Sequence, residues 1–262
     1  MYEHAANANP PADGPLLPIW HLDRGWSLFI GTLGRNASHA HSVPVYIAGV
    51  YAPFRMKIGG GDWLTCRSAV VPAGVPYEFD VAGQPLAVLY LEPNEGCVDT
   101  LVPLAGDARE VGGALVSDRG PQLLRELYEA RDGAMFAEAA VADLLSFAKS
   151  KERRALDVRI SRVVDALSSG VEDSLQVADA ARDVGLSASR FQHLFADEIG
   201  VPFRRFRVWQ RLRTAIGEIA GGNSFTDAAH SAGFFDQAHF ARAFRSAFGA
   251  PASPSLRKVR QG

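Results

Sequence analysis

The feature that most constrains this chain is a segment near its C-terminal end that occurs twice. Residues 177–202 read VADAARDVGLSASRFQHLFADEIGVP, and residues 225–251 read FTDAAHSAGFFDQAHFARAFRSAFGAP. The copies align at an offset of 48 residues through the central glycines, Gly185 and Gly233, and at an offset of 49 after one inserted residue in the second copy. An internal duplication of this quality predicts two structural units of the same kind.

Each copy has the pattern of two helices joined by a tight turn. Gly185 and Gly233 follow the first helix, where the backbone must turn left-handed and glycine does so at least cost. Ser187 and Asp236 are suited to cap the start of the second helix. That second helix carries apolar residues at i, i+3 and i+4, which predicts one buried face and leaves the other free. The free faces hold Arg, Gln and His, whose donors and acceptors can read base edges in the major groove.

An arginine-rich helix is expected between the two copies, and Gly221 with Gly222 should end it. A rigid helix there would fix the distance between the two units. Two paired units joined by such a helix favour DNA binding over an ordinary helical domain with a solvated basic face. The residues expected to contact DNA are Ser189, Arg190, Gln192, His193, Arg205, Arg211, Gln237, Ala238, His239, Ala241, Arg242 and Arg245.

The charge of the chain is divided unevenly along its length. Residues 1–150 contain 10 Lys and Arg against 17 Asp and Glu, whereas residues 151–262 contain 17 against 12. The net charges of the two halves are therefore −7 and +5, although the whole chain carries only −2. This asymmetry indicates a basic module joined to an acidic one and raises the expectation of a polyanionic partner.

The acidic half has a different periodicity from the basic half. Up to about residue 115, short runs rich in Val, Ile, Tyr and Phe alternate with Gly and Pro, which is typical of a β-sandwich or barrel. Helical spacing of apolar residues begins at Pro121. We therefore expect three segments: a β-domain at residues 1–120, a helical dimerisation and linker segment at residues 121–152, and a helical DNA-binding domain at residues 153–262.

The segment 160–256 resembles the DNA-binding domain of AraC/XylS-family transcription regulators. The resemblance rests on RLRTA at residues 211–215 and on the long motif AAHSAGFFDQAHFARAFRSAFG in the second copy, where Phe235 stands in place of the usual small or polar residue. The N-terminal half is similar to the cupin-like effector domain of that family. The resemblance implies an α+β protein with an N-terminal cupin-like β-barrel followed by helices, and a C-terminal all-α domain of two helix-turn-helix motifs.

The same resemblance implies several partners. Two recognition helices would enter successive major grooves of double-stranded promoter DNA. The N-terminal barrel would bind a small-molecule effector, the protein would form a homodimer, and RNA polymerase would be a further partner. We expect an activator, although the sequence leaves repression open as the alternative.

His39 and His41 are the strongest candidates for chemistry in the acidic half, because residues i and i+2 of a strand share a face. Cupin enzymes have a similar His-x-His pair but add a Glu and a later His, and Tyr77 stands at that later position. We therefore expect no metal, no cofactor and no catalytic residue. The expected effector site is His39, His41, Tyr46, Trp63 and Tyr77. The alternative is a cupin-type metalloenzyme domain fused to a DNA-binding module, which would purify with a stoichiometric metal.

The remaining features concern location. No apolar run approaches the ~20 residues of a membrane span. The N-terminus lacks a basic patch followed by an apolar stretch, which is the pattern of a secretory signal. The chain has two cysteines, Cys66 and Cys97, too few for a disulfide framework. We therefore expect a cytoplasmic protein that does not associate with membranes.

Overall fold

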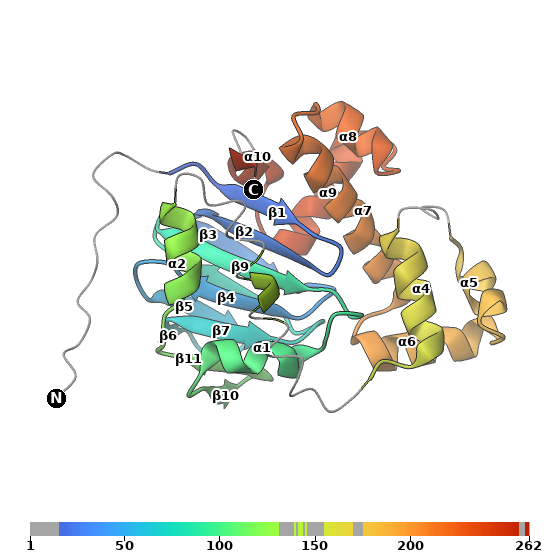
Figure 1. Ribbon diagram of the computed structural model, residues 1–262, viewed down its shortest axis with the longest axis horizontal. Helices are drawn as coiled ribbons and strands as arrows, with labels where there is room; N and C mark the ends of the chain where they lie inside the picture. Colours follow the sequence, from blue (N-terminus) through green and yellow to red (C-terminus); the bar gives the residue numbers. More distant parts are fainter. Residues whose placement is uncertain are drawn as a thin grey trace.

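The computed structural model has an N-terminal β-domain and a C-terminal helical domain (Figure 1). This is the α+β architecture that the sequence predicts. Most of the helical dimerisation and linker segment expected at residues 121–152 lies outside the described part of the chain after residue 130. The structure describes residues 16–130, 139, 141–143, 145, 155–169, 175–256 and 260–261.

Two sheets face each other in the N-terminal domain. The larger sheet has the strand order β10-β11-β7-β4-β9-β2-β1-β12, and the smaller has the order β3-β8-β5-β6. All described pairings are antiparallel except that of β1 with β12. The strands are β1 (Ile19–Leu22), β2 (Trp26–Thr32), β3 (Arg35–His39), β4 (Val45–Gly49), β5 (Phe54–Ile58), β6 (Leu64–Cys66), β7 (Ser68–Val71), β8 (Tyr77–Asp80), β9 (Pro85–Leu91), β10 (Arg109–Val111), β11 (Ala114–Ser117) and β12 (Arg260–Gln261).

Strand β4 shows why the larger sheet is buried on both faces. Side chains alternate along a strand, so Val45 and Ile47 enter the core shared with the smaller sheet. Tyr46 and Ala48 point to the opposite face, where they join a second apolar cluster. Helices α1 (Val98–Ala105) and α2 (Gln122–Glu129) cover that face and contribute to the cluster.

The C-terminal domain repeats one helical pair on either side of a long helix. In Figure 1, α7 lies between the group α4–α6 and the group α8–α10. Its apolar face, which includes Trp209, Leu212 and Ile216, is fully buried. The helices are α4 (Val158–Ser168), α5 (Val177–Asp183), α6 (Ala188–Ile199), α7 (Phe203–Ala220), α8 (Phe225–Ser231), α9 (Gln237–Phe248) and α10 (Ala252–Leu256). No helix in the described part of the chain has the length and apolar character needed to cross a bilayer.

The turns of both repeats have the expected chemistry. Gly185 and Gly233 adopt φ values of +68° and +72°, in the left-handed region. The side chain of Ser187 accepts a hydrogen bond from the third residue of α6, and that of Asp236 accepts one from His239 N in α9. These caps hold the start of each second helix in a defined direction, which is what a recognition helix requires.

The two domains share a buried polar junction. The carboxylate of Glu92, which follows β9 and is only 2% exposed, accepts hydrogen bonds from Trp209 Nε1 at 2.8 Å and Gln210 Nε2 at 2.7 Å. Arg213 Nη1 lies 3.4 Å from the same carboxylate, and its Nε donates to the hydroxyl of Ser27. Helix α7 is thereby joined to the larger sheet by three neighbouring side chains.

Helix α7 also contains a glycine at a position where the structure has room for a side chain. Gly217 lies in the helix interior, and a Cβ there would meet no atom within 4 Å. Replacing Gly217 by Ala should therefore raise the free energy of unfolding by up to ~1 kcal/mol, because alanine loses less backbone entropy in a helix. Urea unfolding of the full chain followed by circular dichroism measures the change.

Gly233→Ala is the matched control, because its φ is left-handed. That variant should lose about 1–2 kcal/mol. A Gly217→Ala protein that is no more stable than the wild type would contradict the prediction.

Candidate DNA-binding surface and effector cavity

The first recognition helix, α6, presents its expected contact residues to solvent. Ser189, Arg190, Gln192 and His193 are all exposed, while Phe191 on the opposite side of the helix is completely buried. The Nδ1 atom of His193 is 2.8 Å from Ser189 O. Because a carbonyl only accepts hydrogen bonds, Nδ1 carries the hydrogen in the neutral ring and Nε2 is left as an acceptor.

The second recognition helix, α9, presents all but one of its expected contact residues on its free side. Gln237, Ala238, Ala241, Arg242 and Arg245 are at least partly exposed on its free side. His239, by contrast, belongs to the turn. Its Nδ1 accepts a hydrogen bond from Phe235 N at 3.4 Å, and its ring packs edge-on against Phe234. The structure thus gives His239 a role in shaping the start of α9.

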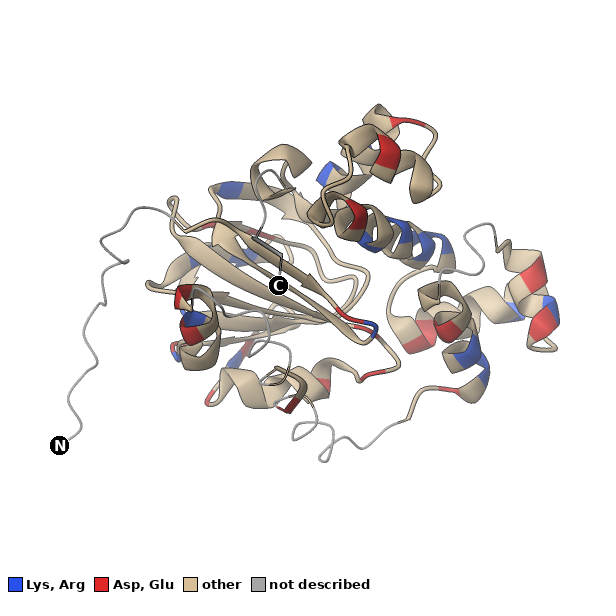
Figure 2. Cartoon of the chain, turned by 45° about the horizontal axis from the view of Figure 1, so that its top comes forward, with Lys and Arg blue, Asp and Glu red and all other residues tan. Residues whose placement is uncertain are grey.

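Arginines of α7 form the basic band of the domain, visible as blue segments along this helix in Figure 2. Two of them are engaged within the protein. Arg205 donates to Ala40 O in the N-terminal domain. Arg211 donates to Ala232 O at 2.9 Å, and its guanidinium lies 4.4 Å from the ring centre of Phe234. Both were expected at the DNA surface; here Arg205 joins the domains and Arg211 braces the second turn.

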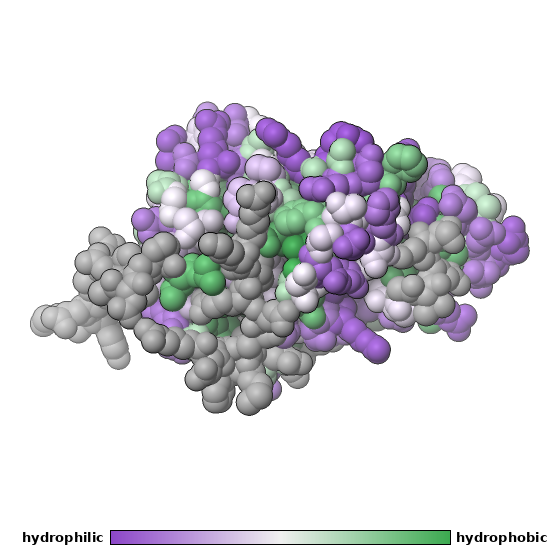
Figure 3. Space-filling view, turned by 90° about the horizontal axis from the view of Figure 1, so that it is seen from above, coloured by the Kyte–Doolittle hydropathy of each residue, from purple (hydrophilic) through white to green (hydrophobic). Residues whose placement is uncertain are grey.

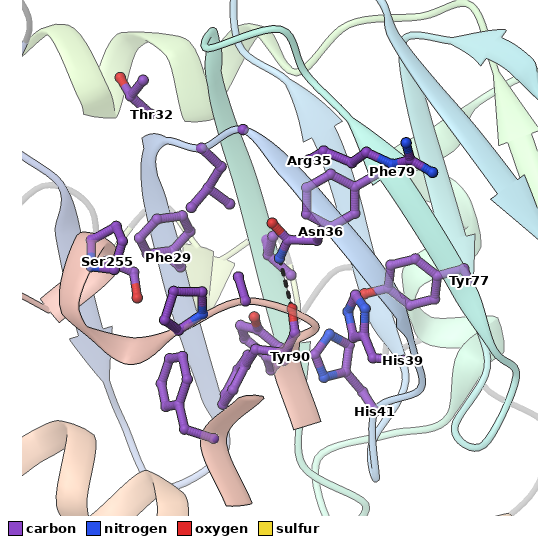
Figure 4. Close-up of a pocket in the computed structure, with 18 of the residues that line it drawn as sticks. Phe29, Thr32, Arg35, Asn36, His39, His41, Tyr77, Phe79, Tyr90 and Ser255 are labelled. Atoms are coloured by element: carbon purple, nitrogen blue, oxygen red, sulfur yellow. Dashed lines mark hydrogen bonds between the residues drawn. The ribbon is translucent and has the colours of Figure 1, made fainter. Parts of the chain in front are cut away.

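A cavity of about 230 Å³ lies where the two domains meet. Its N-terminal wall includes His39, His41 and Tyr77, which were expected to form an effector site (Figure 4). Its other wall comes from the end of α9 and from α10. The lining residues are mainly aromatic or apolar and include Trp20, Phe29, Phe79, Val88, Tyr90, Phe244, Phe248, Pro251 and Pro254.

Two of the five expected effector residues lie away from this cavity, so the structure does not bring the five together. Tyr46 is buried on the other face of β4, in the cluster under α1 and α2. The sequence placed it among aromatic residues of the β-domain but could not say which face of the strand it occupied. Trp63 lies before β6, with the guanidinium groups of Arg35 and Arg55 at 5.4 and 5.0 Å from its ring centre. Neither Tyr46 nor Trp63 lines the cavity.

The residues of the C-terminal wall were missed by sequence reasoning. Their patterns marked them as core of the helical domain, and nothing in the sequence showed that the N-terminal domain would cover them. Asn36 Nδ2 donates to Phe248 O at 2.6 Å, the bond drawn in Figure 4, and Trp20 Nε1 donates to Ser255 O at 3.1 Å. The sequence Gly249-Ala250-Pro251 directly follows α9, and Pro251 lines the cavity.

Burial keeps both histidines of the cavity neutral at pH 7. The ring centres of His39 and His41 are 4.9 Å apart. Desolvation lowers the pKa of His39 to about 4, and it lowers the pKa of His41 well below 6.5, with His39 and Arg205 adding smaller repulsive effects. His39 Nδ1 lies 2.8 Å from Ala37 O, to which it donates in the neutral ring.

Two buried polar atoms beside the cavity have no hydrogen-bond partner: His41 Nδ1 and the hydroxyl of Tyr77. Both residues line the cavity and are at most 4% exposed. An unsatisfied buried polar atom costs free energy, so a polar group in the cavity would be stabilised there. Within the described residues, no three His, Cys, Asp or Glu side chains come close enough together to hold a metal ion.

Comparisons with known proteins agree with this architecture. Residues 157–258 match the protein family described as "Helix-turn-helix domain". The structure of an apo ToxT variant from Vibrio cholerae superimposes with a TM-score of 0.61 at 15% identity, covering 90% of this chain and 98% of that one. Wild-type ToxT from Vibrio cholerae with a bound unsaturated fatty acid gives a TM-score of 0.58 at 14% identity, covering 92% and 99%.

The repeats, their caps and the matched segment define the C-terminal part of the chain as a double helix-turn-helix domain. A helix-turn-helix domain at this place is what the resemblance in the sequence implied, and the whole chain has the fold of ToxT.

The neutral histidines predict how stability depends on pH. The unfolded chain takes up protons near pH 6.5, whereas folded His39 does so only near pH 4 and folded His41 only well below pH 6.5. The free energy of unfolding is little affected by these groups at pH 7. It decreases as the pH falls below 6.5, because the unfolded chain then binds protons that the folded histidines do not. The free energy of unfolding should therefore fall by up to about 1.4 kcal/mol per pH unit for each histidine in this window.

Urea titrations at pH 7, 6 and 5 measure this slope. Replacing His39 and His41 by Phe should flatten it, whereas exposed His230→Gln, on α8, leaves the pair intact and should preserve it. An unchanged slope in the double variant would show that other groups cause the acid sensitivity.

Proposed function

We propose that the protein is a cytoplasmic regulator that binds promoter DNA with α6 and α9 and responds to a small molecule held between its two domains. The observation that carries this proposal is the composition of the cavity wall. His41 and Tyr77 come from the N-terminal domain, whereas Phe244 and Phe248 come from the second recognition helix. A ligand that fits one placement of α9 better than another shifts the protein toward that placement.

The DNA-binding part of the proposal follows from the exposed faces. In helix-turn-helix proteins the N-terminal part of the recognition helix contacts base edges in the major groove. Arg190 and Gln192 on α6, and Gln237 and Arg242 on α9, supply the bidentate donors and acceptors suited to guanine and adenine. The exposed Arg204 of α7 is suited to the phosphate backbone. Of the other expected contact residues, Arg205, Arg211 and His239 make contacts within the protein. The remaining ones stay predictions of the same kind: Ser189, His193, Ala238, Ala241 and Arg245.

The chemistry of the cavity favours an amphipathic ligand. Its walls would hold an apolar body, and His41 Nδ1 together with the Tyr77 hydroxyl would bind a polar head. Solved ToxT structures provide a parallel. One contains an unsaturated fatty acid, and another, at 12% identity and a TM-score of 0.57, contains (E)-4-(8-methylnaphthalen-1-yl)but-3-enoic acid. Both compounds combine an apolar body with one polar head.

Dimerisation through the segment 121–152 and activation through contact with RNA polymerase complete the proposal. Helix α2, at the start of that segment, lies on the face of the larger sheet opposite the cavity. A second copy docked there would leave α6 and α9 free for DNA. The domain limits at residues 120 and 152 belong to this proposal as well.

Selection of DNA sequences from random duplexes by the full chain tests DNA recognition. Affinity for the selected site should fall steeply with salt, because bound arginines release counterions from the phosphates. Arg242→Ala should weaken binding by ~1–3 kcal/mol and relax specificity at one base pair.

The matched control is Arg182→Ala, which removes an exposed arginine of α5 that is paired with Asp179. This variant should retain the sequence preference. If Arg242→Ala weakened every duplex equally, Arg242 would be a phosphate contact, and if the wild type selected no sequence, the proposed function would be wrong.

Ligand binding is tested by thermal shift with an unsaturated fatty acid and with naphthalenes that carry a carboxylate or a hydroxyl group. At a concentration of 100 Kd a bound probe should stabilise the protein by about 2.7 kcal/mol. His41→Phe removes one unpaired atom and narrows the cavity, so the shift should be lost. Trp63→Phe changes an aromatic residue outside the cavity and should keep the shift.

A probe that stabilises wild type and His41→Phe equally would bind elsewhere and contradict this site. DNA affinity measured with and without the probe gives the coupling between the two sites, which is the same whichever ligand is added first.

A further inference from the structure

The second helix-turn-helix unit is one residue longer than the first, and the extra residue lies directly before the recognition helix. In the first unit, Leu186 packs on the core and is followed at once by the N-cap Ser187. In the second unit, Phe234 fills the equivalent core position and Asp236 is the N-cap. Phe235 stands between them and has no counterpart in the first copy.

Two consecutive phenylalanines in this turn have opposite environments. Phe234 is 3% exposed and lies under the guanidinium of Arg211, whereas Phe235 is 83% exposed. The backbone of Phe235 is nevertheless fixed, because its N–H donates to His239 Nδ1 and the next residue, Asp236, caps α9. The ring is therefore presented to solvent from a defined position at the N-terminal end of α9.

No other large hydrophobic side chain in the described part of the chain is as exposed as Phe235; the next is Val158, on α4, at 63%. Among the residues coloured in Figure 3, which is seen from above, hydrophilic ones occupy much of the rim and hydrophobic ones gather near the centre. Phe235 lies just before α9, and the exposed residues of the first turns of α9 include Ala238 and Ala241. Their small side chains allow a partner molecule to approach the helix closely. An apolar ring kept in water at this position contributes nothing to the core.

We propose that Phe235 is a specificity-determining residue that recognises thymine, its ring packing against the C5 methyl group in the major groove read by α9. This inference rests on the proposed DNA-binding function. The N-terminal end of a recognition helix is the part that lies nearest the base edges. The thymine methyl is the one apolar group that base pairs present in the major groove, and phenylalanine is among the side chains that contact it. The contact removes both apolar surfaces from water.

The test is a double-mutant cycle with the full chain and the duplex that it selects. Each thymine contacted by the α9 half-site is replaced in turn by deoxyuridine, which lacks only the methyl group. Wild type should lose about fourfold in affinity at one of these positions, the value expected for one buried methyl group. Phe235→Ala should bind the thymine duplex weakly and should not distinguish it from the deoxyuridine duplex.

Val158→Ala, which truncates an exposed apolar residue away from the recognition helices, is the matched control and should keep the full thymine preference. Two results would overturn the inference and leave the proposed function intact. In the first, the wild type selects a sequence but binds the thymine and deoxyuridine duplexes equally well. In the second, the wild type and Phe235→Ala bind the selected duplex with equal affinity. In the second case, loss of transcription with purified RNA polymerase by Phe235→Ala would reassign the ring to a protein contact. Failure of wild type to select any sequence would instead refute the proposed function.

Discussion

The carboxylate of Glu92 joins the two halves of this protein, and the placement of the recognition helices depends on it. It is almost fully buried and accepts hydrogen bonds from Trp209 and Gln210, with Arg213 as the neighbouring cation. Removing one partner of a buried pair is costly, because the remaining charge has lost its water. Helix α7 is thus held against the larger sheet, and α7 in turn is the helix on which both helix-turn-helix units pack.

The N-terminal domain also meets the C-terminal end of each recognition helix. The left-handed cap of α6, Gly200, lies against Ala73, where a Cβ would come within 3.2 Å of the backbone oxygen. The equivalent cap of α9, Gly249, offers its carbonyl to Ala37 N at 2.9 Å. The Gly-x-Pro segments that close both repeats therefore serve as docking points as well as helix ends. The cavity lies beside the second of them, so a ligand bound there would lie close to the point where α9 is held.

Sequence reasoning succeeded where the determinants were local. The N-caps Ser187 and Asp236 and the left-handed glycines of the repeats depend only on neighbouring residues, and all four are in place. It was less successful in grouping the residues of the cavity, because membership of a cavity depends on contacts between distant segments. Trp63 had the right residue type in the right domain, yet it lies beside two arginines away from the cavity.

The sequence by itself determined the fold of the C-terminal domain, since a duplicated helix–turn–helix pattern with glycine turns and capping residues leaves few other folds open to it. It also determined which side of each recognition helix is free, because helical spacing separates a buried face from an exposed one. Only the tertiary structure decided that the aromatic end of α9 closes a cavity begun by His39 and His41. It also decided that Arg205 joins the domains. Both outcomes depend on how the β-domain packs against the helical domain. The periodicity of apolar residues shows which face of a helix or strand is buried, but it does not show which distant segment covers that face.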